Sequence, residues 1–375
     1  MAAAALSDYR RLVIKVGSSL LVDESGQLNR RWLQSLADDL AEFQADNHEV
    51  LIVSSGAIAL GSSVLGINKK RARLPDLQAA AAAGQVQLVH AYQEALGKHR
   101  IQAAQILLTP EDTENRRRFL NARSTLSRLL DLSVVPIVNE NDTVTTEEIR
   151  YGDNDRLAAR VAQLVMADVL ILLSDVDGLY SADPGANSNA RHIPEVRTIG
   201  ADIVAVAGET RSDIGSGGMA TKVQAARIAT HAGCSTIIAS GTVNHPLQEL
   251  ARGARQTVFL AEGTPASARK QWLAGALDVR GEIRIDDGAA KALQNGNSLL
   301  PVGVTGIGGS FRRGDVVTVV GPDGAEMGRG LTEYSAADAA SLQGCQSDQI
   351  EERLGYRGRS VMIHRDELVL FDNDR

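Results

Sequence analysis

A chain of 375 residues is long enough to bury a large core and to form two domains. Apolar residues make up 44% of the chain, only 3% of residues are aromatic, and the formal net charge is −7. These values argue against a general surface for nucleic acid or for an anionic membrane. The apolar runs are too short to span a membrane and the first residues lack a signal-peptide pattern, so we expect a cytoplasmic protein with no membrane partner.

Short apolar runs alternate with longer helical patterns up to about residue 260. The expected strands are 11–17, 49–56, 103–109, 134–142, 168–175, 235–241 and 257–261, and the expected helices are 29–46, 74–98, 115–130, 155–166 and 219–232. The runs are continuously apolar, which is typical of strands buried on both faces. Their alternation with helices predicts an α/β fold with a mostly parallel open sheet sandwiched by helices. In such a sheet, ligands bind beyond the carboxyl ends of the strands.

The pattern changes after residue 262. Residues 263–280 read as a linker with a short helix, and residues 281–375 hold short segments with dense turn signals, which predict a small C-terminal β-barrel domain. The predicted first domain is therefore 1–262. From Gly281 to Arg375 there are 10 basic and 15 acidic residues, so strong RNA binding is not expected there. A local basic patch at Arg312 and Arg313 or at Arg353–Arg359 leaves weak binding open.

The glycine-rich stretch IGSGGMATK at residues 214–222 precedes a predicted helix. It is not a Walker loop, and its relaxed dinucleotide pattern lacks a preceding strand and a following acidic residue. Backbone N–H groups at a helix N-terminus favour an anion, and Lys222 in the first turn adds a positive charge. These residues alone support a phosphate site and an ordinary loop equally.

Lys15 lies inside the first apolar run, where a lysine is uncommon unless it is paired or functional. It either extends its ammonium group to solvent at the strand's end or stands at the carboxyl edge of the sheet. In the second case, Gly17 leaves room for a ligand to approach closely.

Polar residues gather at three other junctions of the predicted sheet. VNENDTV places Asn139 and Asp142 directly after a strand, SSGAIALG places Ser55 at a strand-to-helix turn, and YGDNDRLAA places Asn154 and Asp155 at a helix start. Helix capping is the alternative explanation for the last of these. Together with two lysines and glycine turns, the clusters fit phosphoryl transfer, which depends on positioning and charge neutralisation.

The motifs VIKVGSSLL, VSSGAIALG, FLNARSTL, VNENDTV, GDNDRLAA, SDVDGLY and GSGGMATK occur in this order. In this combination the chain closely resembles the glutamate 5-kinases of the amino-acid kinase superfamily. The resemblance covers essentially the whole chain, including a C-terminal part that is similar to a PUA domain. It implies transfer of the γ-phosphoryl group of ATP, with Mg²⁺, to the side-chain carboxylate of L-glutamate. The product would be L-glutamyl 5-phosphate, in the first step of proline biosynthesis.

The resemblance also implies roles for individual residues. Lys15 and Lys222 would neutralise the transferring phosphoryl group from opposite sides, and Asp155 would orient both lysines. The residues implied to hold glutamate are Ser55, Asp142 and Asn154, with Asn139 and Asp153 as neighbours. The residues implied to bind nucleotide are Lys15, Ser174, Asp175, Ser216, Gly217, Gly218, Met219, Ala220, Thr221 and Lys222. Ser174 and Ser216 stand where the family often has threonine, which keeps the hydroxyl group. No protein ligand for a metal is assigned.

The resemblance further implies a homo-oligomer, inhibition by proline and a possible transfer of the product to glutamyl phosphate reductase. The basic run Arg116–Arg118 is either a solvated helix face or an oligomer contact. The nearest alternative is a related kinase that acts on acetylglutamate, aspartate or carbamate, but Asp142 favours a substrate with a free α-ammonium group. Cys234 and Cys345 are far apart in the sequence, and we expect both to be reduced.

Overall fold

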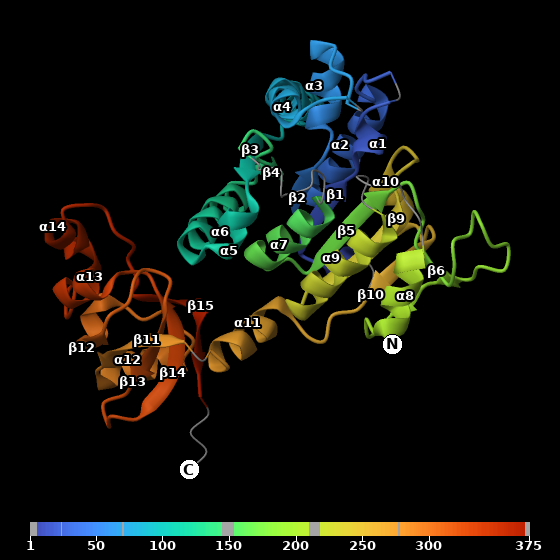
Figure 1. Cartoon of the computed structure of the whole chain (residues 1–375). Helices are drawn as coiled ribbons and strands as arrows, with labels where there is room; N and C mark the ends of the chain where they lie inside the picture. Colours follow the sequence, from blue (N-terminus) through green and yellow to red (C-terminus); the bar gives the residue numbers. More distant parts are fainter. Residues whose placement is uncertain are drawn as a thin grey trace. The chain divides into compact units, whose positions relative to one another are not determined.

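The computed structural model describes residues 6–23, 25–69, 71–144, 154–209, 218–276 and 278–371. The chain divides into two compact units, residues 1–265 and 266–375, and each is described by itself. A mostly parallel sheet with helices on both faces forms the first unit, and a smaller β-rich sheet forms the second (Figure 1).

The sheet of the first unit has the strand order β3-β4-β2-β1-β5-β9-β10-β8. Its strands are β1 (Arg11–Val16), β2 (Glu49–Ser54), β3 (Ala103–Leu108), β4 (Val135–Glu140), β5 (Val169–Ser174), β8 (Glu195–Val196), β9 (Ser235–Ser240) and β10 (Gln256–Phe259). The paired strands are parallel except that β10 runs antiparallel to β9. The predicted α/β class and mostly parallel sheet are therefore confirmed.

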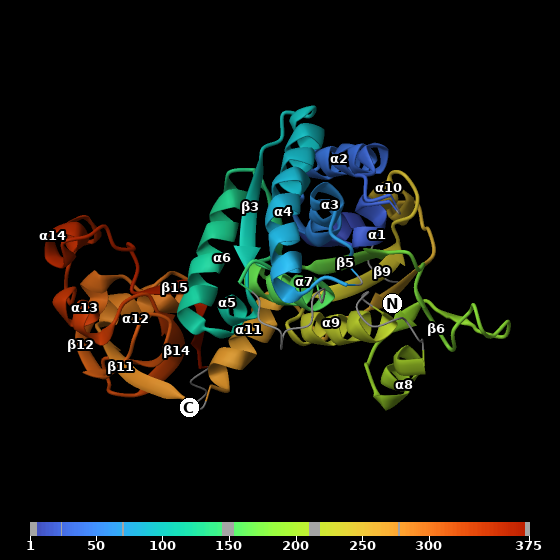
Figure 2. The same ribbon diagram turned by 45° about the horizontal axis from the view of Figure 1, so that its top comes forward.

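Helices cover both faces of this sheet (Figure 2). The core on one face includes residues of α1 (Ser18–Leu21), α2 (Arg30–Ala45), α3 (Ala57–Leu65), α4 (Leu74–Gly97) and α10 (Pro246–Ala251). The core on the other face includes residues of α6 (Arg116–Asp131), α7 (Asn154–Val165), α8 (Ala201–Glu209) and α9 (Met219–His231). Two short helices, η1 (Leu6–Asp8) and α5 (Pro110–Glu114), complete the helices described in this unit.

The first strand directs its lysine toward a defined face of the sheet. Side chains alternate along a strand, and Leu12 and Ile14 belong to the core under α2 and α4, whereas Val13 belongs to the core under α7 and α9. Lys15 therefore shares the face of Val13. β1 also lies between β2 and β5, where the order of the strands reverses, and such a switch point opens a crevice at the carboxyl ends.

The expectation that every strand is buried on both faces is wrong for β3. Leu107 is 37% exposed and Gln105 is also exposed, because β3 is an edge strand with β4 as its one neighbour. A hairpin of β6 (Leu179–Tyr180) and β7 (His192–Ile193) was not expected, since two-residue strands leave no periodic signal.

Helices α3 and α4 approach each other through two glycines. A Cβ atom at Gly61 would lie 1.7 Å from the carbonyl oxygen of Ala80, and one at Gly84 would lie 1.8 Å from that of Ala57. Both contacts are with backbone atoms, so no side chain can move aside. The two glycines therefore fix the position of α3 against α4, and α3 starts two residues after Ser55.

We expect Gly84→Ala to destabilise the protein by about 1–3 kcal/mol or more, because the new methyl group separates α3 from α4. The matched control is Gly97→Ala at the end of the same helix, where an added Cβ has no atom within 4 Å. That change is expected to be neutral or to stabilise by up to about 1 kcal/mol, since alanine favours a helix. Urea unfolding of both variants tests the contact, and equal free energies of unfolding would contradict it.

The second unit contains a five-stranded sheet in the order β12-β11-β13-β14-β15. Its strands are β11 (Val279–Ile285), β12 (Val304–Gly309), β13 (Val316–Val320), β14 (Glu326–Thr332) and β15 (Ile363–Leu370). The helices of this part of the chain are α11 (Pro265–Ala274), α12 (Asp287–Gln294), η2 (Pro301–Gly303), α13 (Ala336–Ser341), η3 (Ser347–Gln349) and α14 (Ile350–Leu354). The unit has its own apolar core, so the predicted β-rich C-terminal domain is confirmed.

Both cysteines are free and buried, as expected from their separation in the sequence. Within the described ranges, none of the helices combines the length and the apolar character that crossing a bilayer requires.

Candidate active site

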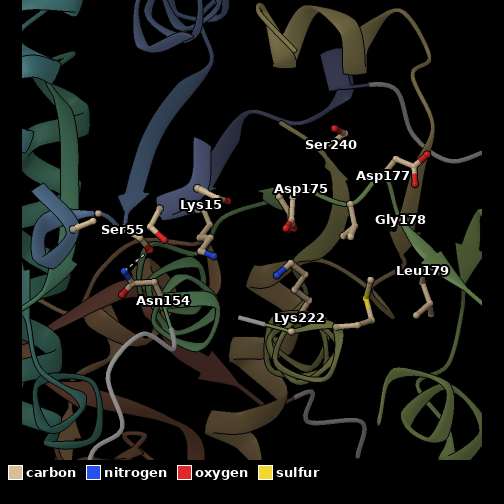
Figure 3. Close-up of a pocket in the computed structure, with 18 of the residues that line it drawn as sticks. Lys15, Ser55, Asn154, Asp175, Asp177, Gly178, Leu179, Lys222 and Ser240 are labelled. Atoms are coloured by element: carbon tan, nitrogen blue, oxygen red, sulfur yellow. Dashed lines mark hydrogen bonds between the residues drawn. The ribbon is translucent and has the colours of Figure 1, made fainter. Parts of the chain in front are cut away.

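A cavity of about 800 Å³ lies at the carboxyl ends of β1, β2, β4 and β5 (Figure 3). The turn from β2 into α3 lines one side of the cavity. Gly56 makes this turn with a φ of 106°, a conformation that favours glycine. The residues expected from the sequence that line the cavity are Lys15, Ser55, Asn139, Asp142, Asn154, Ser174, Asp175, Gly218, Met219 and Lys222. Folding therefore gathers residues from six separate segments into one site.

Two buried lysines share one buried carboxylate beside this cavity. Lys15 Nζ lies 2.6 Å from Asp155 Oδ1, and Lys222 Nζ lies 3.3 Å from Asp155 Oδ2. Asp155 is 1% exposed, and the lysines are 6% and 3% exposed. Asp155 occupies the first turn of α7 and Lys222 the first turn of α9, so the packing of α7 beside α9 creates the arrangement.

The electrostatics of this group favour an anion in the cavity. Burial opposes ionisation of Asp155, but the ammonium groups of Lys15 and Lys222 outweigh burial and hold the pKa of Asp155 below its ordinary value. Burial lowers the pKa of Lys222, and repulsion by Lys15 lowers it further, against the attraction of Asp155. Because two cations share Asp155, the group keeps positive charge that a bound phosphate can neutralise.

A hydrogen-bond network surrounds Asn154 on one side of the lysines. The Asn154 Nδ2 group donates to Ser55 Oγ at 2.7 Å (Figure 3). It also donates to Asn139 Oδ1 at 3.2 Å and to the carbonyl oxygen of Ser54 at 3.1 Å. Its Oδ1 atom is buried and has no hydrogen-bond partner among the described residues. A buried acceptor without a partner is costly, so this atom is available for a donor on a ligand.

Asp142 follows β4 and is buried in the same cavity. Burial raises the pKa of its carboxyl group to about 6. Within the part of the chain that the structure describes, no cation pairs with this carboxylate. An ammonium group on a ligand would supply the missing charge.

The residues that line the opposite side of the cavity lie at the end of β5 and directly after it. Ser174 Oγ donates to Asp175 Oδ1 at 2.9 Å, and the lining continues through Asp177, Gly178 and Leu179 (Figure 3). These last three residues were not assigned from the sequence, although they belong to the motif SDVDGLY that directly follows the strand. Their position after a buried strand is the signal that could have found them.

Some of the expected site residues do not line the cavity. Asp155 lies behind the two lysines, and Thr221 Oγ1 donates to Asp155 Oδ2 at 3.0 Å. Ala220 is exposed on α9 and is not part of the lining. Asp153, Ser216 and Gly217 lie outside the described residues.

Helix α4 supports the site through two polar residues that were not predicted. Gln85 Oε1 accepts from Asn139 Nδ2 at 2.8 Å, and the Tyr92 hydroxyl group lies 3.1 Å from Ser54 Oγ. Asn139 is thus engaged on both sides, by Gln85 and by Asn154. The separation of seven residues puts Gln85 and Tyr92 on one helix face, and that spacing is the signal available in the sequence.

The comparisons with known proteins agree with this arrangement. Residues 10–240 match the amino acid kinase family, and residues 281–354 match the PUA domain. The α/β sheet with its lysine-lined cavity is therefore an amino acid kinase domain, followed by a PUA domain.

Similarity to individual proteins narrows this class. The glutamate 5-kinase of Ruegeria sp. (strain TM1040) is 54% identical over 368 residues, which cover 98% of this chain and 100% of that protein. The glutamate 5-kinase of Rhodopseudomonas palustris (strain BisB5) is 53% identical over 371 residues, 99% of each chain. This chain belongs to the glutamate 5-kinase family, which confirms the resemblance found in its motifs. A solved carbamate kinase from Giardia lamblia bound to AMP-PNP is a distant likeness, with 16% identity, a TM-score of 0.48 and coverage of 68% of this chain and 100% of that one.

Proposed function

We propose that this cavity binds L-glutamate and ATP and transfers the γ-phosphoryl group to the side-chain carboxylate, forming L-glutamyl 5-phosphate. Glutamate 5-kinase activity, the first step of proline biosynthesis, follows from the family. The roles of individual residues are our proposal. The observation that carries it is the pair of buried lysines that share Asp155 at the carboxyl edge of the sheet.

Charge neutralisation by Lys15 and Lys222 is the main catalytic contribution in this proposal. The acceptor carboxylate of glutamate is ionised at neutral pH, so no general base is needed. Its oxygen forms a bond to the γ-phosphorus while the bond to the oxygen of ADP breaks. Both lysines lie where the charge on the transferred group can be balanced, and Asp155 holds them in place.

Glutamate is proposed to lie beside Ser55, Asp142 and Asn154. Asp142 pairs with the α-ammonium group, and the Asn154 Oδ1 atom accepts a further hydrogen bond from it. Asn139 positions Asn154 from behind, since its own amide oxygen accepts from Asn154 Nδ2. Asp153 remains a proposed neighbour on the basis of the motif alone.

ATP is proposed to lie against Ser174, Asp175 and the loop Ser216–Lys222 at the start of α9. Mg²⁺ is proposed to enter with the nucleotide and to neutralise phosphate charge. Among the described residues there is no cluster of three metal-ligating side chains. Mg²⁺ usually keeps several waters and is bound through one or two carboxylates beside the substrate phosphates. Asp175 on the cavity lining is the carboxylate that would hold it.

Turnover with trapping of the product tests the proposed function. The protein is incubated with ATP, Mg²⁺ and L-glutamate, L-aspartate or N-acetyl-L-glutamate, and hydroxylamine converts any acyl phosphate to a hydroxamate. We expect a hydroxamate from free glutamate alone. A product from acetylglutamate or aspartate instead would overturn the substrate and the role of Asp142.

Asp142 gives the reaction a predicted pH dependence. Because burial raises the pKa of its carboxyl group to about 6, the carboxylate that would pair with ammonium is lost as the pH falls through that value. We expect kcat/KM for glutamate to fall below about pH 6. Asp142→Asn should raise the KM for glutamate by about tenfold or more at pH 7.5 and abolish this acidic limb. An unchanged limb in that variant would assign it to another group.

We also propose a homo-oligomer, inhibition by proline that competes with glutamate, and transfer of the labile product to glutamyl phosphate reductase. Inhibition is checked by adding millimolar proline at subsaturating glutamate, and the oligomer by the mass of the particle in solution. An effect of proline that saturating glutamate does not relieve would exclude competition at this site.

A further inference from the structure

Lys69 is a third lysine on the lining of the active-site cavity, together with Lys15 and Lys222. It lies on the segment that follows α3. It also lines an adjoining cavity of about 560 Å³, and the two cavities share Ser18, Ser19, Ala59 and Lys69. Lys69 therefore lies at the border between α1 and α3, on the side of the site where Ser55 leads into α3.

Lys69 differs from the other two lysines in its charge environment. Lys15 and Lys222 are paired with Asp155, whereas Lys69 forms no ion pair with any carboxylate in the described ranges. Lys69 as a whole residue is exposed to solvent. Partial burial of its side chain by neighbouring atoms nevertheless lowers the pKa of its ammonium group. A partly desolvated cation without a protein partner is stabilised by an anionic ligand.

The adjoining cavity adds a second polar group without a partner. Ser62 is 4% exposed, and its Oγ atom is buried without a hydrogen-bond partner in the described part of the chain. Ser62 and Lys69 line this cavity together with several other hydroxyl groups and with Asp23, whose carboxylate accepts hydrogen bonds from Ser25 Oγ and from the backbone N–H of Gln27. The region beside Lys69 is thus suited to the oxygen atoms of a small anion.

The choice of anion follows from the charges of the substrate. Glutamate carries two carboxylates and one ammonium group. The proposed function places the side-chain carboxylate beside the phosphoryl group that Lys15 and Lys222 neutralise and pairs the ammonium group with Asp142, which leaves the α-carboxylate without an assigned cation. The residues proposed for ATP, from Ser174 onward, follow β5, whereas Lys69 borders α1 and α3.

We propose that Lys69 binds the α-carboxylate of L-glutamate and thereby helps to select an α-amino acid over carboxylic acids that lack an α-carboxylate. This inference rests on the proposed function. Recognition of one substrate then involves opposite charges at its α-carbon, Asp142 for the ammonium group and Lys69 for the carboxylate.

The test compares Lys69→Met with the unchanged protein. We expect the KM for L-glutamate to rise by about tenfold or more while kcat and the KM for ATP change by less than about twofold. Lys69→Arg keeps the cation and should retain most of the affinity for glutamate. Lys98→Met, which removes an exposed lysine at the end of α4, is the matched control and should change none of these constants.

A substrate analogue separates recognition of the α-carboxylate from a general effect on the site. γ-Aminobutyrate keeps the acceptor carboxylate and the ammonium group but lacks the α-carboxylate. Its inhibition constant against glutamate should therefore be the same in Lys69→Met and in the unchanged protein.

Three results would overturn the inference. They are an unchanged KM for glutamate in Lys69→Met, a KM for ATP that rises instead, or an equal loss of γ-aminobutyrate affinity. Failure of the proposed function would be seen separately, as an absence of hydroxamate from glutamate in the unchanged protein.

Discussion

Lys222→Met is expected to lower kcat by at least about 100-fold and to leave the KM for glutamate nearly unchanged. Methionine fills a similar volume but carries no charge, so the transferred phosphoryl group loses one of its two cations. The fold should persist because Asp155 keeps its closer partner, Lys15, at 2.6 Å. Steady-state turnover, followed as hydroxamate, gives both constants.

Arg227→Met on the same helix is the matched control, because Arg227 is an exposed cation of α9. It should leave kcat unchanged. Thermal unfolding of both variants separates a catalytic effect from a loss of folded protein. Normal turnover in correctly folded Lys222→Met would show that Lys222 does not take part in phosphoryl transfer, and this would contradict the proposed mechanism.

The strands and their contribution to the site were predictable because each is a local apolar run. Lys15, for example, could be assigned to the first strand from the run alone, whereas the cores on the two faces of the sheet show which face it shares. Strand order is a different matter, since no local pattern shows that β3 ends the sheet and exposes Leu107. Hydrophobic patterning reports burial and not the identity of the neighbour.

The residues behind the site were less predictable than those that line it. Asn139 was expected beside glutamate, but its amide group donates to Gln85, 54 residues away in the sequence. Nothing near Asn139 indicates that partner, because the contact arises only when α4 packs against α3 through Gly61 and Gly84. A similar long-range contact joins Ser54 to Tyr92. The spacing of Gln85 and Tyr92 indicates that they share a helix face, but it does not show which residues they contact, because tertiary packing sets these pairs.

Asp155→Asn is expected to be the most damaging single change to the stability of the first unit. It removes the carboxylate that lies 2.6 Å from Lys15 and 3.3 Å from Lys222, so two buried ammonium groups lose the carboxylate that they share. Breaking a buried ion pair on one side costs about 3–5 kcal/mol. We expect a loss of this size in urea unfolding at pH 7, whereas Asp131→Asn at the exposed end of α6 should change stability by less than about 0.5 kcal/mol.

Two further measurements separate charge from packing in this variant. Adding Lys222→Met to Asp155→Asn removes one of the two buried cations, so the double variant should be more stable than Asp155→Asn alone. The loss should also shrink as the pH rises toward about 10, because a buried lysine that loses a carboxylate partner binds its proton less tightly in the folded chain. The unfolded chain then binds more protons than the folded one. A destabilisation that is independent of pH and of Lys222 would mean that Asp155 acts through packing, and the shared carboxylate would no longer explain how the two lysines are held together.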